Sequence, residues 1–255
     1  SPQFNLMYRA CRKASKTLIR DFGEIEKLQV SEKSPGDFVT ASDKRVEKII
    51  IDELKKTGYS FLTEETGLIE GKYKDKRWII DPIDGTFNFL NGLPHFAISV
   101  GYEENGEIVS GIVFDPIKNE IFSAHKGSGA YLNNFRMRVS NKSNFKNACL
   151  VHGGPKGTSK AREFILDEYK KISMKTNTNI RKSGSAALDL AYVAAGRYDG
   201  FWQRELKYWD IAAGLILVKE SGGFVENLKE EGFNKEKVDI VASNSKIHKE
   251  LRNFL

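Results

Sequence analysis

The sequence predicts a mixed α and β fold, in which amphipathic helices alternate with largely antiparallel strands. Three observations support this prediction. Two helical stripes occupy the first part of the chain, the middle changes to the period of strands around an Asn-Gly pair, and the second half alternates between the two patterns. The Asn-Gly hairpin argues against a purely parallel sheet of the dinucleotide-binding type.

The first part of the chain is expected to form two helices separated by a turn at residues 34–37. The first helix spans residues 3–22, and its apolar stripe consists of Met7, Ala10, Ala14 and Leu18. The second spans residues 40–56 and is ended by Gly58; its stripe consists of Val46, Ile49, Ile50 and Leu54. Both helices therefore have one face available for burial.

The middle of the chain is expected to form an antiparallel meander. Strand-like segments at residues 96–102 and 108–114 are joined by Asn105-Gly106, and a third strand at residues 121–124 is followed by a turn at residues 127–129. Residues 72–77 mix lysines with an acid and are expected to form a solvated turn. Because neighbouring strands of a meander are antiparallel, these segments predict a largely antiparallel sheet.

The second half of the chain is expected to contain three longer helices and two short strands. One helix carries the stripe Phe164, Ile165, Tyr169 and Ile172. The others span residues 186–195, closed by Gly196, and residues 210–220, closed by Gly222-Gly223. Strands near residues 224–226 and 240–242 precede a terminal helix from Ser245. No repeat or linker interrupts the pattern, so residues 1–255 are expected to form one domain.

Composition places the chain among ordinary globular proteins. Of its 255 residues, 40% are hydrophobic and 29% are charged. No apolar run is long enough to span a membrane, and the N-terminal segment lacks the apolar core and cleavage site of a secretory signal. Cys11 and Cys149 are isolated, which favours reduced thiols in a cytoplasmic protein over a disulfide framework.

The net charge of +6, with a pI near 9.1, is compatible with two kinds of partner. A basic protein can bind nucleic acid, or it can handle anionic phosphates. The basic residues are scattered and interleaved with acids, which disfavours specific nucleic-acid binding. The four histidines, His95, His125, His152 and His248, are far apart in the sequence and form no zinc motif.

The most informative segment is the run from Trp78 to Phe89. A short apolar stretch ends in Asp81 and Asp84, which lie on either side of Pro82 and are followed by Gly85 and Thr86. Proline stiffens the turn, so both carboxylates can project to one side, and glycine lets backbone N–H groups approach an anion. Magnesium prefers one or two carboxylates together with substrate phosphate. The segment therefore predicts a metal and phosphate site, although such a turn taken alone is often only a loop with a helix cap.

Two further acidic motifs have ordinary explanations when each is considered alone. Glu64 and Glu65 follow a short apolar strand and would usually be solvated loop charges, whereas Asp210 would be a helix cap. If Glu64 and Asp210 share a cleft with Asp81 and Asp84, their repulsion requires either bound divalent cations or a sharply raised carboxyl pKa. Bound metal is the simpler explanation.

These segments together resemble the inositol monophosphatase family. The run from Trp78 to Phe89 matches its Trp-x-x-Asp-Pro-x-Asp-Gly-Thr-x-Asn-Phe pattern. The other matches are Glu-Glu-Thr-Gly from Glu64, Val-Thr-x-x-Asp ending at Asp43, Gly-Ser-Ala-Ala from Gly184, and Trp-Asp ending at Asp210. The resemblance covers nearly the whole chain. It implies an α+β fold built as a layered α/β/α/β/α sandwich of the sugar-phosphatase type, with largely antiparallel sheets.

The resemblance also implies roles for individual residues. Two or three Mg²⁺ ions would be held by Glu64, Asp81, the carbonyl of Ile83, Asp84 and Asp210. The implied catalytic residues are Glu64, Thr86 and Asp43, with Asp43 accepting a hydrogen bond from Thr86, whose hydroxyl orients the attacking water. Glu65 would lie next to the metals, and Lys33 resembles a lysine on the family's metal-binding loop. The implied substrate contacts are Glu64, Ile83, Asp84, Gly85, Thr86, Arg181, Gly184, Ser185, Ala186, Gln203 and Asp210.

Gln203 departs from the family pattern, because many inositol phosphatases have a glutamate there that binds sugar hydroxyls. A glutamine loses the charge-assisted hydrogen bond, which weakens the case for strict inositol phosphate specificity.

The resulting expectation is a cytoplasmic, homodimeric, lithium-sensitive, magnesium-dependent phosphomonoesterase. It would hydrolyse inositol monophosphate or a similar small sugar or polyol phosphate with metal-activated water. The alternatives are a phosphatase for fructose 1,6-bisphosphate, histidinol phosphate or a 3′-phosphonucleotide, or a regulatory protein associated with RNA polymerase. The regulatory alternative comes from bacterial relatives of the extragenic suppressor type.

Overall fold

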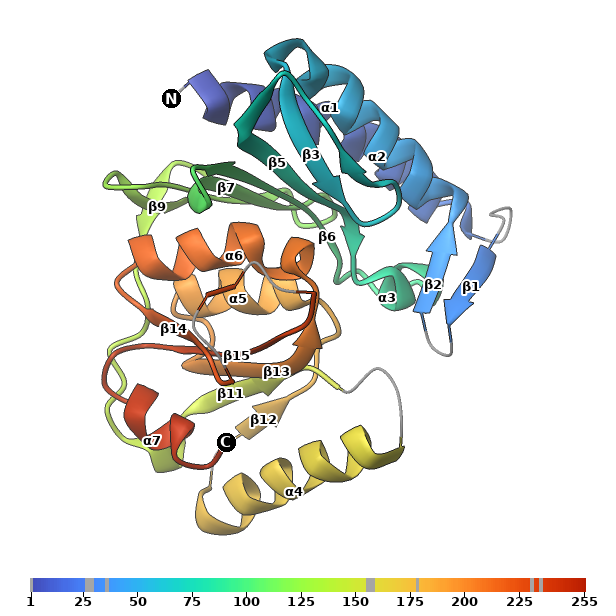
Figure 1. Ribbon diagram of the computed structural model, residues 1–255. Coiled ribbons are helices and arrows are strands. Elements are labelled where there is room, and N and C mark those ends of the chain that lie inside the picture. The colour runs from blue at the N-terminus through green and yellow to red at the C-terminus, as the bar shows by residue number, and fades with distance from the viewer. Residues whose placement is uncertain are drawn as a thin grey trace.

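The computed structural model describes residues 2–25, 30–34, 37–154, 159–177, 179–229, 232–233 and 236–255. Helices α1 (Pro2–Phe22) and α2 (Ala41–Leu54) cover one face of an eight-stranded sheet, and α5 (Ala186–Ala194) and α6 (Tyr208–Glu220) cover the other (Figure 1). A five-stranded sheet follows, with α4 (Ser159–Lys175) and α7 (His248–Arg252) on its outer side (Figure 1). This order confirms the α/β/α/β/α sandwich.

The eight-stranded sheet contains the predicted meander and the strand that carries the two aspartates. Its strand order is β10 (Phe135–Met137), β9 (Gly129–Leu132), β8 (Glu120–His125), β7 (Glu107–Asp115), β6 (Ala97–Glu104), β5 (Tyr73–Asp84), β3 (Tyr59–Thr63) and β4 (Gly67–Ile69). Neighbouring strands are antiparallel except β3 and β5, which are parallel. Asn105 and Gly106 both have positive φ, 52° and 78°, as a tight hairpin turn requires.

The five-stranded sheet is only half antiparallel. Its order is β12 (Asn179–Arg181), β11 (Cys149–His152), β13 (Gly200–Leu206), β15 (Val238–Ser243) and β14 (Phe224–Asn227). Strand β11 pairs parallel with both β12 and β13, whereas β15 pairs antiparallel with both β13 and β14. Strands β14 and β15 were predicted, whereas β11, β12 and β13 were not. The prediction of largely antiparallel sheets therefore holds best for the larger sheet.

The remaining elements are short. Strands β1 (Val30–Ser34) and β2 (Asp37–Thr40) form a hairpin, and Pro35 and Gly36 of the predicted turn lie outside the described residues. Helix α3 (Thr86–Leu90) follows β5, and two 3₁₀ turns, η2 (Lys55–Thr57) and η3 (Phe145–Asn147), precede β3 and β11. Gly58 has a φ of 72° and ends η2, in agreement with the predicted end of the second helix.

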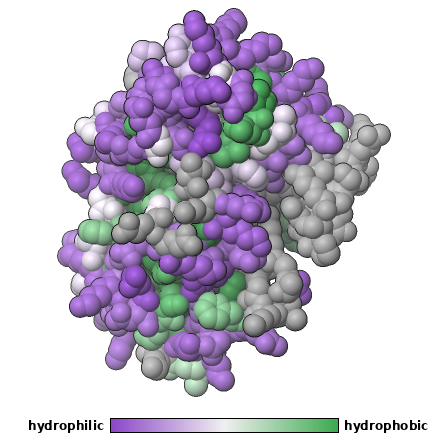
Figure 2. All heavy atoms as spheres, viewed as in Figure 1, coloured by the Kyte–Doolittle hydropathy of each residue, from purple (hydrophilic) through white to green (hydrophobic). Residues whose placement is uncertain are grey.

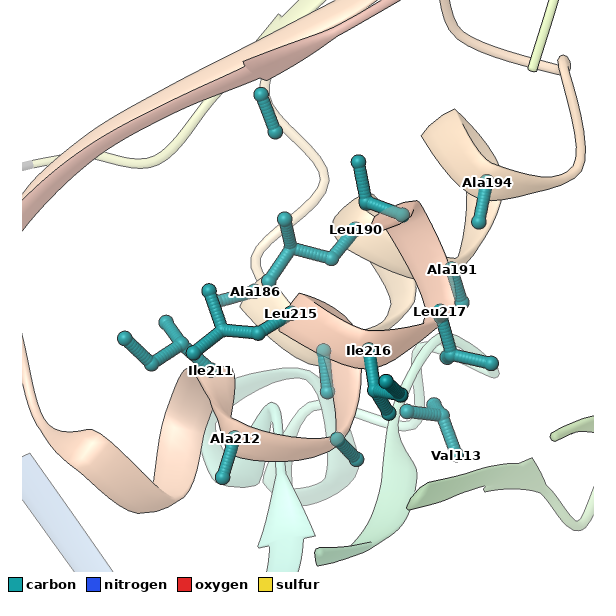
Figure 3. Close-up of a cluster of buried hydrophobic side chains, with 14 of the residues drawn as sticks. Val113, Ala186, Leu190, Ala191, Ala194, Ile211, Ala212, Leu215, Ile216 and Leu217 are labelled. Atoms are coloured by element: carbon teal, nitrogen blue, oxygen red, sulfur yellow. The ribbon is translucent and has the colours of Figure 1, made fainter. Parts of the chain in front are cut away.

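Alternating side chains of the larger sheet separate two hydrophobic cores. On β5, Trp78 and Ile80 pack against α1 and α2, whereas Ile79 faces the core around α5 and α6. Figure 3 shows that second core, where Leu190 and Ala191 of α5 lie beside Leu215 and other residues of α6. A third core under α4 and α7 includes Trp202 of β13. Each layer of the sandwich is thus held by its own apolar contacts.

Helix α6 lies close to the larger sheet because Gly111 of β7 has no side chain. A Cβ at Gly111 would come within 2.8 Å of the Ile216 side chain and 2.9 Å of the Ala213 Cα. Real Cβ atoms do not approach other atoms so closely, so a larger residue would push α6 away from the sheet. This contact matters because the first turn of α6 carries Asp210.

Three local predictions were wrong or incomplete. Residues 73–77 are the start of β5 and not a solvated turn, because Lys76 and Arg77 pair with Glu104 and Glu103 on neighbouring β6. Helices α6 and α7 begin at Tyr208 and His248, away from the predicted starts at residues 210 and 245. Only half of the α4 stripe is buried: Ile165 and Ile172 are in the core, whereas Phe164 and Tyr169 are exposed.

Within the described residues, no helix is long and apolar enough to cross a membrane. The face shown in Figure 2 is mainly hydrophilic, with hydrophobic residues in small separate groups. This face offers no broad apolar belt.

Strand β13 contains a strained residue that yields a stability prediction. Glu205 has a φ of 57° in a bulge between Gln203 and Leu206, and its N–H donates to Asp239 Oδ1 at 2.8 Å. Glu205→Gly should raise the free energy of unfolding by roughly 0.5–1 kcal/mol, because glycine adopts this conformation without steric cost. Urea denaturation measures the change. The control Glu205→Ala keeps the strain and loses the same exposed ion pair with Lys237, so it should give no gain; an equal gain would show that removal of the Glu205 side chain, and not relief of strain, is the cause.

Candidate metal and phosphate site

Three carboxylates converge between the end of strand β5 and the first turn of helix α6. Asp81 and Asp84 lie at the end of β5, and Asp210 lies in the first turn of α6. One carboxylate oxygen from each lies within 4.8 Å of the others. Asp210 also accepts a hydrogen bond from the Lys207 N–H at 2.8 Å, so its cap role and its place in the cluster coexist. Residues separated by more than a hundred positions in sequence are thus brought together.

Glu64 adds a fourth carboxyl group beside this cluster. It follows β3, the parallel neighbour of β5, and its N–H donates to the Ile80 carbonyl at 3.2 Å. Burial raises the pKa of Asp81 well above its usual value, and the negative charges of Glu64, Asp84 and Asp210 raise it further. Glu64 also hydrogen-bonds to Asp81. Four carboxyl groups so arranged are an oxygen donor set suited to hard divalent cations.

The backbone after Asp81 forms a rigid turn. The Ile83 N–H donates to Asp81 Oδ1 at 3.0 Å, and the Ile83 carbonyl accepts from the Thr86 hydroxyl at 2.9 Å. Gly85 has a φ of 100°, and a Cβ there would lie 3.1 Å from the His95 carbonyl oxygen. The turn therefore requires glycine, and it holds the Ile83 carbonyl and the Thr86 hydroxyl next to the acidic cluster.

Asp43 connects the start of α2 to this turn. Its Oδ2 accepts from the Thr40 N–H at 2.8 Å, which closes a capping box, while its Oδ1 lies 3.3 Å from the Thr86 hydroxyl oxygen. The two explanations suggested by the sequence, a helix cap and a partner of Thr86, are therefore both present. Burial raises the pKa of Asp43 to about 6. Its carboxylate is a hydrogen-bond acceptor for Thr86 when ionised.

The Gly184-Ser185-Ala186 segment lies behind Asp84. The Ser185 hydroxyl and the Ala187 N–H, at 2.7 Å, both donate to Asp84 Oδ2. Ser185 and Ala186 are buried, and Ser185 also caps α5. The hydrogen bonds from Ser185 and Ala187 hold the Asp84 carboxylate in place. Gly184 is exposed at the surface of this segment, with a φ of 91°.

The other predicted site residues lie outside the eight-stranded sheet that carries Asp81 and Asp84. Gln203 is half-buried in β13, not in a loop, and its side chain packs on Gly153 so closely that a Cβ there would lie 1.8 Å from Gln203 Oε1. Arg181 is exposed in β12. Burial raises the pKa of the Tyr198 hydroxyl, and the positive charge of Arg181 opposes that rise. None of the described hydrogen bonds within the acidic cluster involves Arg181. Lys33 lies in β1, with its side chain outside the described atoms.

Three residues that the sequence did not single out also contact the site. Glu47 of α2 accepts from the Glu65 N–H at 2.9 Å and from the Thr66 hydroxyl. Asn88 donates to the Ser183 and His95 carbonyls, each at 2.8 Å, and Asp189 accepts from the Ser183 hydroxyl. Two of them had usable signals: Asn88 is the asparagine of the matched Thr-x-Asn-Phe motif, and Glu47 lies four residues after Asp43 and so shares its helix face.

Comparisons with known proteins agree with this geometry. The model of the inositol monophosphatase family matches residues 2–254. An inositol-1-monophosphatase of Rhizobium meliloti is 46% identical, over 100% of this chain and 96% of the relative. The Nus factor SuhB of Escherichia coli is 41% identical, over 89% of this chain and 85% of the relative.

Solved structures show the same fold. The extragenic suppressor protein suhB of Bartonella henselae superposes with a TM-score of 0.94 at 43% identity, covering 100% of this chain and 98% of that one. The match thus extends over the whole sandwich and all of the segments that meet at the acidic cluster. This chain is therefore a member of the inositol monophosphatase family, a family of phosphatases.

Proposed function

We propose that this protein is a magnesium-dependent phosphomonoesterase that acts on inositol monophosphate or a similar small sugar or polyol phosphate. The observation that carries the proposal is the convergence of Asp81, Asp84 and Asp210 beside the Asp43–Thr86 pair. Clustered carboxylates supply metal ligands, and the pair supplies a hydroxyl next to a buried acceptor. Metal-assisted phosphoryl transfer to water uses ligands for the metal and a group that orients the attacking water.

Each site residue has a proposed role. Glu64, Asp81, the Ile83 carbonyl, Asp84 and Asp210 would hold two or three Mg²⁺ ions, which supply Lewis acidity and neutralise phosphate charge when bound. Thr86, with Asp43 as its acceptor, orients the attacking water. The N–H groups at Gly85 and Thr86 bind phosphate oxygens. The Gly184–Ala186 segment and Gln203 line the leaving-group side, and the exposed Arg181 adds positive potential.

The proposal also covers the domain organisation, the oligomeric state and the cellular compartment of the protein. Residues 1–255 form one inositol monophosphatase-like domain that assembles as a homodimer. Cys11 and Cys149 are free thiols, as expected of a protein of the cytoplasm.

A phosphate-release screen with and without Mg²⁺ tests the function. The substrates are inositol 1-phosphate, fructose 1,6-bisphosphate, histidinol phosphate and a 3′-phosphonucleotide. We expect magnesium-dependent release, fastest with a small polyol phosphate, and inhibition by Li⁺. Fastest turnover of one of the other three esters would establish the corresponding alternative. Absence of release from every ester in saturating Mg²⁺ would refute the phosphatase proposal.

A regulatory function is the second candidate, because the SuhB relative is named as a Nus factor. Copurification with RNA polymerase that survives a metal-ligand substitution would support that role. Loss of copurification with the same substitution would tie any association to the phosphatase site.

Gln203 should govern substrate choice more than rate. Gln203→Glu restores an anionic acceptor for substrate hydroxyls, worth about 1–2 kcal/mol as a charge-assisted hydrogen bond. The expected result is a several-fold gain in kcat/KM for inositol 1-phosphate, with little change for 4-nitrophenyl phosphate, which has no hydroxyls to bind. Equal effects on both substrates would show that Gln203 acts through folding or metal binding.

A further inference from the structure

Glu47 is a buried acid that uses both carboxylate oxygens on the turn that carries Glu64. It is 2% exposed in the middle of α2. Its Oε2 accepts from the Glu65 N–H at 2.9 Å, and its Oε1 accepts from the Thr66 hydroxyl. Buried carboxylates are costly unless they are hydrogen-bonded, so these two contacts are energetically important.

The turn held by Glu47 connects β3 to β4, and further contacts lie at its start and within it. At its start, the Glu64 N–H donates to the Ile80 carbonyl at 3.2 Å. Farther on, the Thr66 N–H donates to the Thr63 hydroxyl at 3.3 Å, a contact within the turn itself. Glu47 therefore supplies a contact from a separate helix to the two residues that follow Glu64.

Helix α2 thus contacts the site at two points on one face. Asp43 and Glu47 are four residues apart and project to the same side of the helix. Asp43 reaches Thr86 after β5, and Glu47 reaches the turn after β3. Because β3 and β5 are parallel neighbours, these two turns lie at the same edge of the sheet. One rigid helix can therefore fix the relative position of both.

We infer that Glu47 is a positioning residue for magnesium binding, which holds the turn of residues 64–66 so that Glu64 faces Asp81. The inference rests on the proposed function, because it takes Glu64 as a metal ligand. Removal of a direct hydrogen-bond partner of a metal ligand typically changes metal affinity about 10–100-fold. Glu47 bonds to the two residues after Glu64, so we expect the lower end of that range. The role requires the hydrogen bonds of Glu47 and not its charge.

Four substitutions in the full chain test the inference. Glu47→Ala removes both contacts. Glu47→Gln can keep both, because its carbonyl can accept from the Glu65 N–H while its amide donates to the Thr66 hydroxyl oxygen. Thr66→Val removes one contact at an exposed position and should fold. Glu53→Ala, on the same helix, removes an ion pair with Lys13 and is the matched control.

The readouts are the Mg²⁺ affinity from calorimetric titration of the protein, the Mg²⁺ dependence of 4-nitrophenyl phosphate hydrolysis, and the thermal midpoint. Glu47→Ala should weaken Mg²⁺ binding about tenfold while kcat in saturating Mg²⁺ changes by no more than about threefold. Thr66→Val should weaken it less, and Glu47→Gln and Glu53→Ala should remain near the wild type.

Three results would overturn the inference. An unchanged Mg²⁺ affinity in both Glu47→Ala and Thr66→Val would limit Glu47 to a structural role, whatever happens to the thermal midpoint. Equal losses in Glu47→Gln and Glu47→Ala would show that charge is what matters. An equal loss in Glu53→Ala would show a nonspecific effect. If the wild-type protein neither binds Mg²⁺ nor hydrolyses phosphate esters, the proposed function itself fails, which is a separate result.

Discussion

Replacing Asp81 with asparagine should abolish phosphate release while the protein still folds. The substitution is nearly isosteric, but it removes one of the anionic ligands that would hold the Mg²⁺ ions. We expect kcat to fall at least about 10³-fold, because metal ions contribute several kcal/mol to such reactions and each 1.36 kcal/mol is a factor of ten. Phosphate release in saturating Mg²⁺ measures the loss.

The same substitution should leave the metal-free protein equally stable or slightly more stable. Asp81 is buried, and its neighbours raise its pKa, so its charged form is disfavoured in the folded state. A neutral amide removes that repulsion. Because the folded pKa lies above the unfolded one, the wild-type protein without metal should gain stability as the pH falls through the raised pKa. The Asn variant should lack this gain.

The control for Asp81→Asn is Asp75→Asn, at an exposed position on the same strand β5. It should leave both turnover and the Mg²⁺-dependent rise in thermal midpoint unchanged. In Asp81→Asn, Mg²⁺ should no longer raise the midpoint, since ligands stabilise only a state that binds them. Near wild-type turnover of Asp81→Asn would refute the metal assignment, whatever its stability.

The parts of the fold that could be predicted are those encoded by local pattern. Helices α1 and α2 follow their apolar stripes, and the β6–β7 hairpin follows Asn105-Gly106. The parallel strands β11, β12 and β13 were missed because their pairing depends on partners far away in the sequence, and β11 and β12 are also short. The start of β5 was missed because its charged residues are compensated by Glu103 and Glu104, 26 or more positions away.

The acidic cluster was predictable because one segment, from Asp81 to Thr86, carries two of its carboxylates and its turn. The supporting contacts were not, since neither the motif position of Asn88 nor the helix face of Glu47 names a partner, and Asp189 looks like an ordinary polar residue of a helix. Their importance arises only when separate elements meet, as when Asn88 of α3 reaches the carbonyl of Ser183. Ser185 shows a contact of the same kind: the resemblance implies a substrate contact, which stays a prediction, and the structure adds a hydrogen bond from its hydroxyl to Asp84.

Removing either member of the Asp43–Thr86 pair should lower kcat by about 10²–10³-fold, the usual contribution of a positioned proton acceptor. Thr86→Val deletes the hydroxyl while keeping its shape. Asp43→Asn keeps a side-chain oxygen but loses the negative charge that strengthens the hydrogen bond from Thr86. Because the two groups act as a unit, the double variant should be no slower than the slower single variant by more than a few-fold.

The helix cap offers a way to separate catalysis from stability in this pair. Asp43 Oδ2 caps α2, whereas Oδ1 faces Thr86, so Asp43→Asn alone should lower the free energy of unfolding. Thr86→Val leaves the cap of α2 intact, so it should lower kcat without the loss of stability that a damaged cap causes. Strictly additive losses in kcat would show that the two residues act independently, which would contradict a shared role.

The pH dependence gives the sharpest check on Asp43. Its carboxyl accepts the Thr86 hydrogen bond most strongly when it is ionised, and burial raises its pKa to about 6 before any cation binds. Bound cations favour the ionised form and lower that pKa, so the acid limb of kcat in saturating Mg²⁺ should lie below this value. The residual activity of Asp43→Asn should lack the limb altogether, because asparagine does not titrate. If the limb persists unchanged in Asp43→Asn, the titrating group is another carboxyl of the cluster, and Asp43 serves only as the cap of α2.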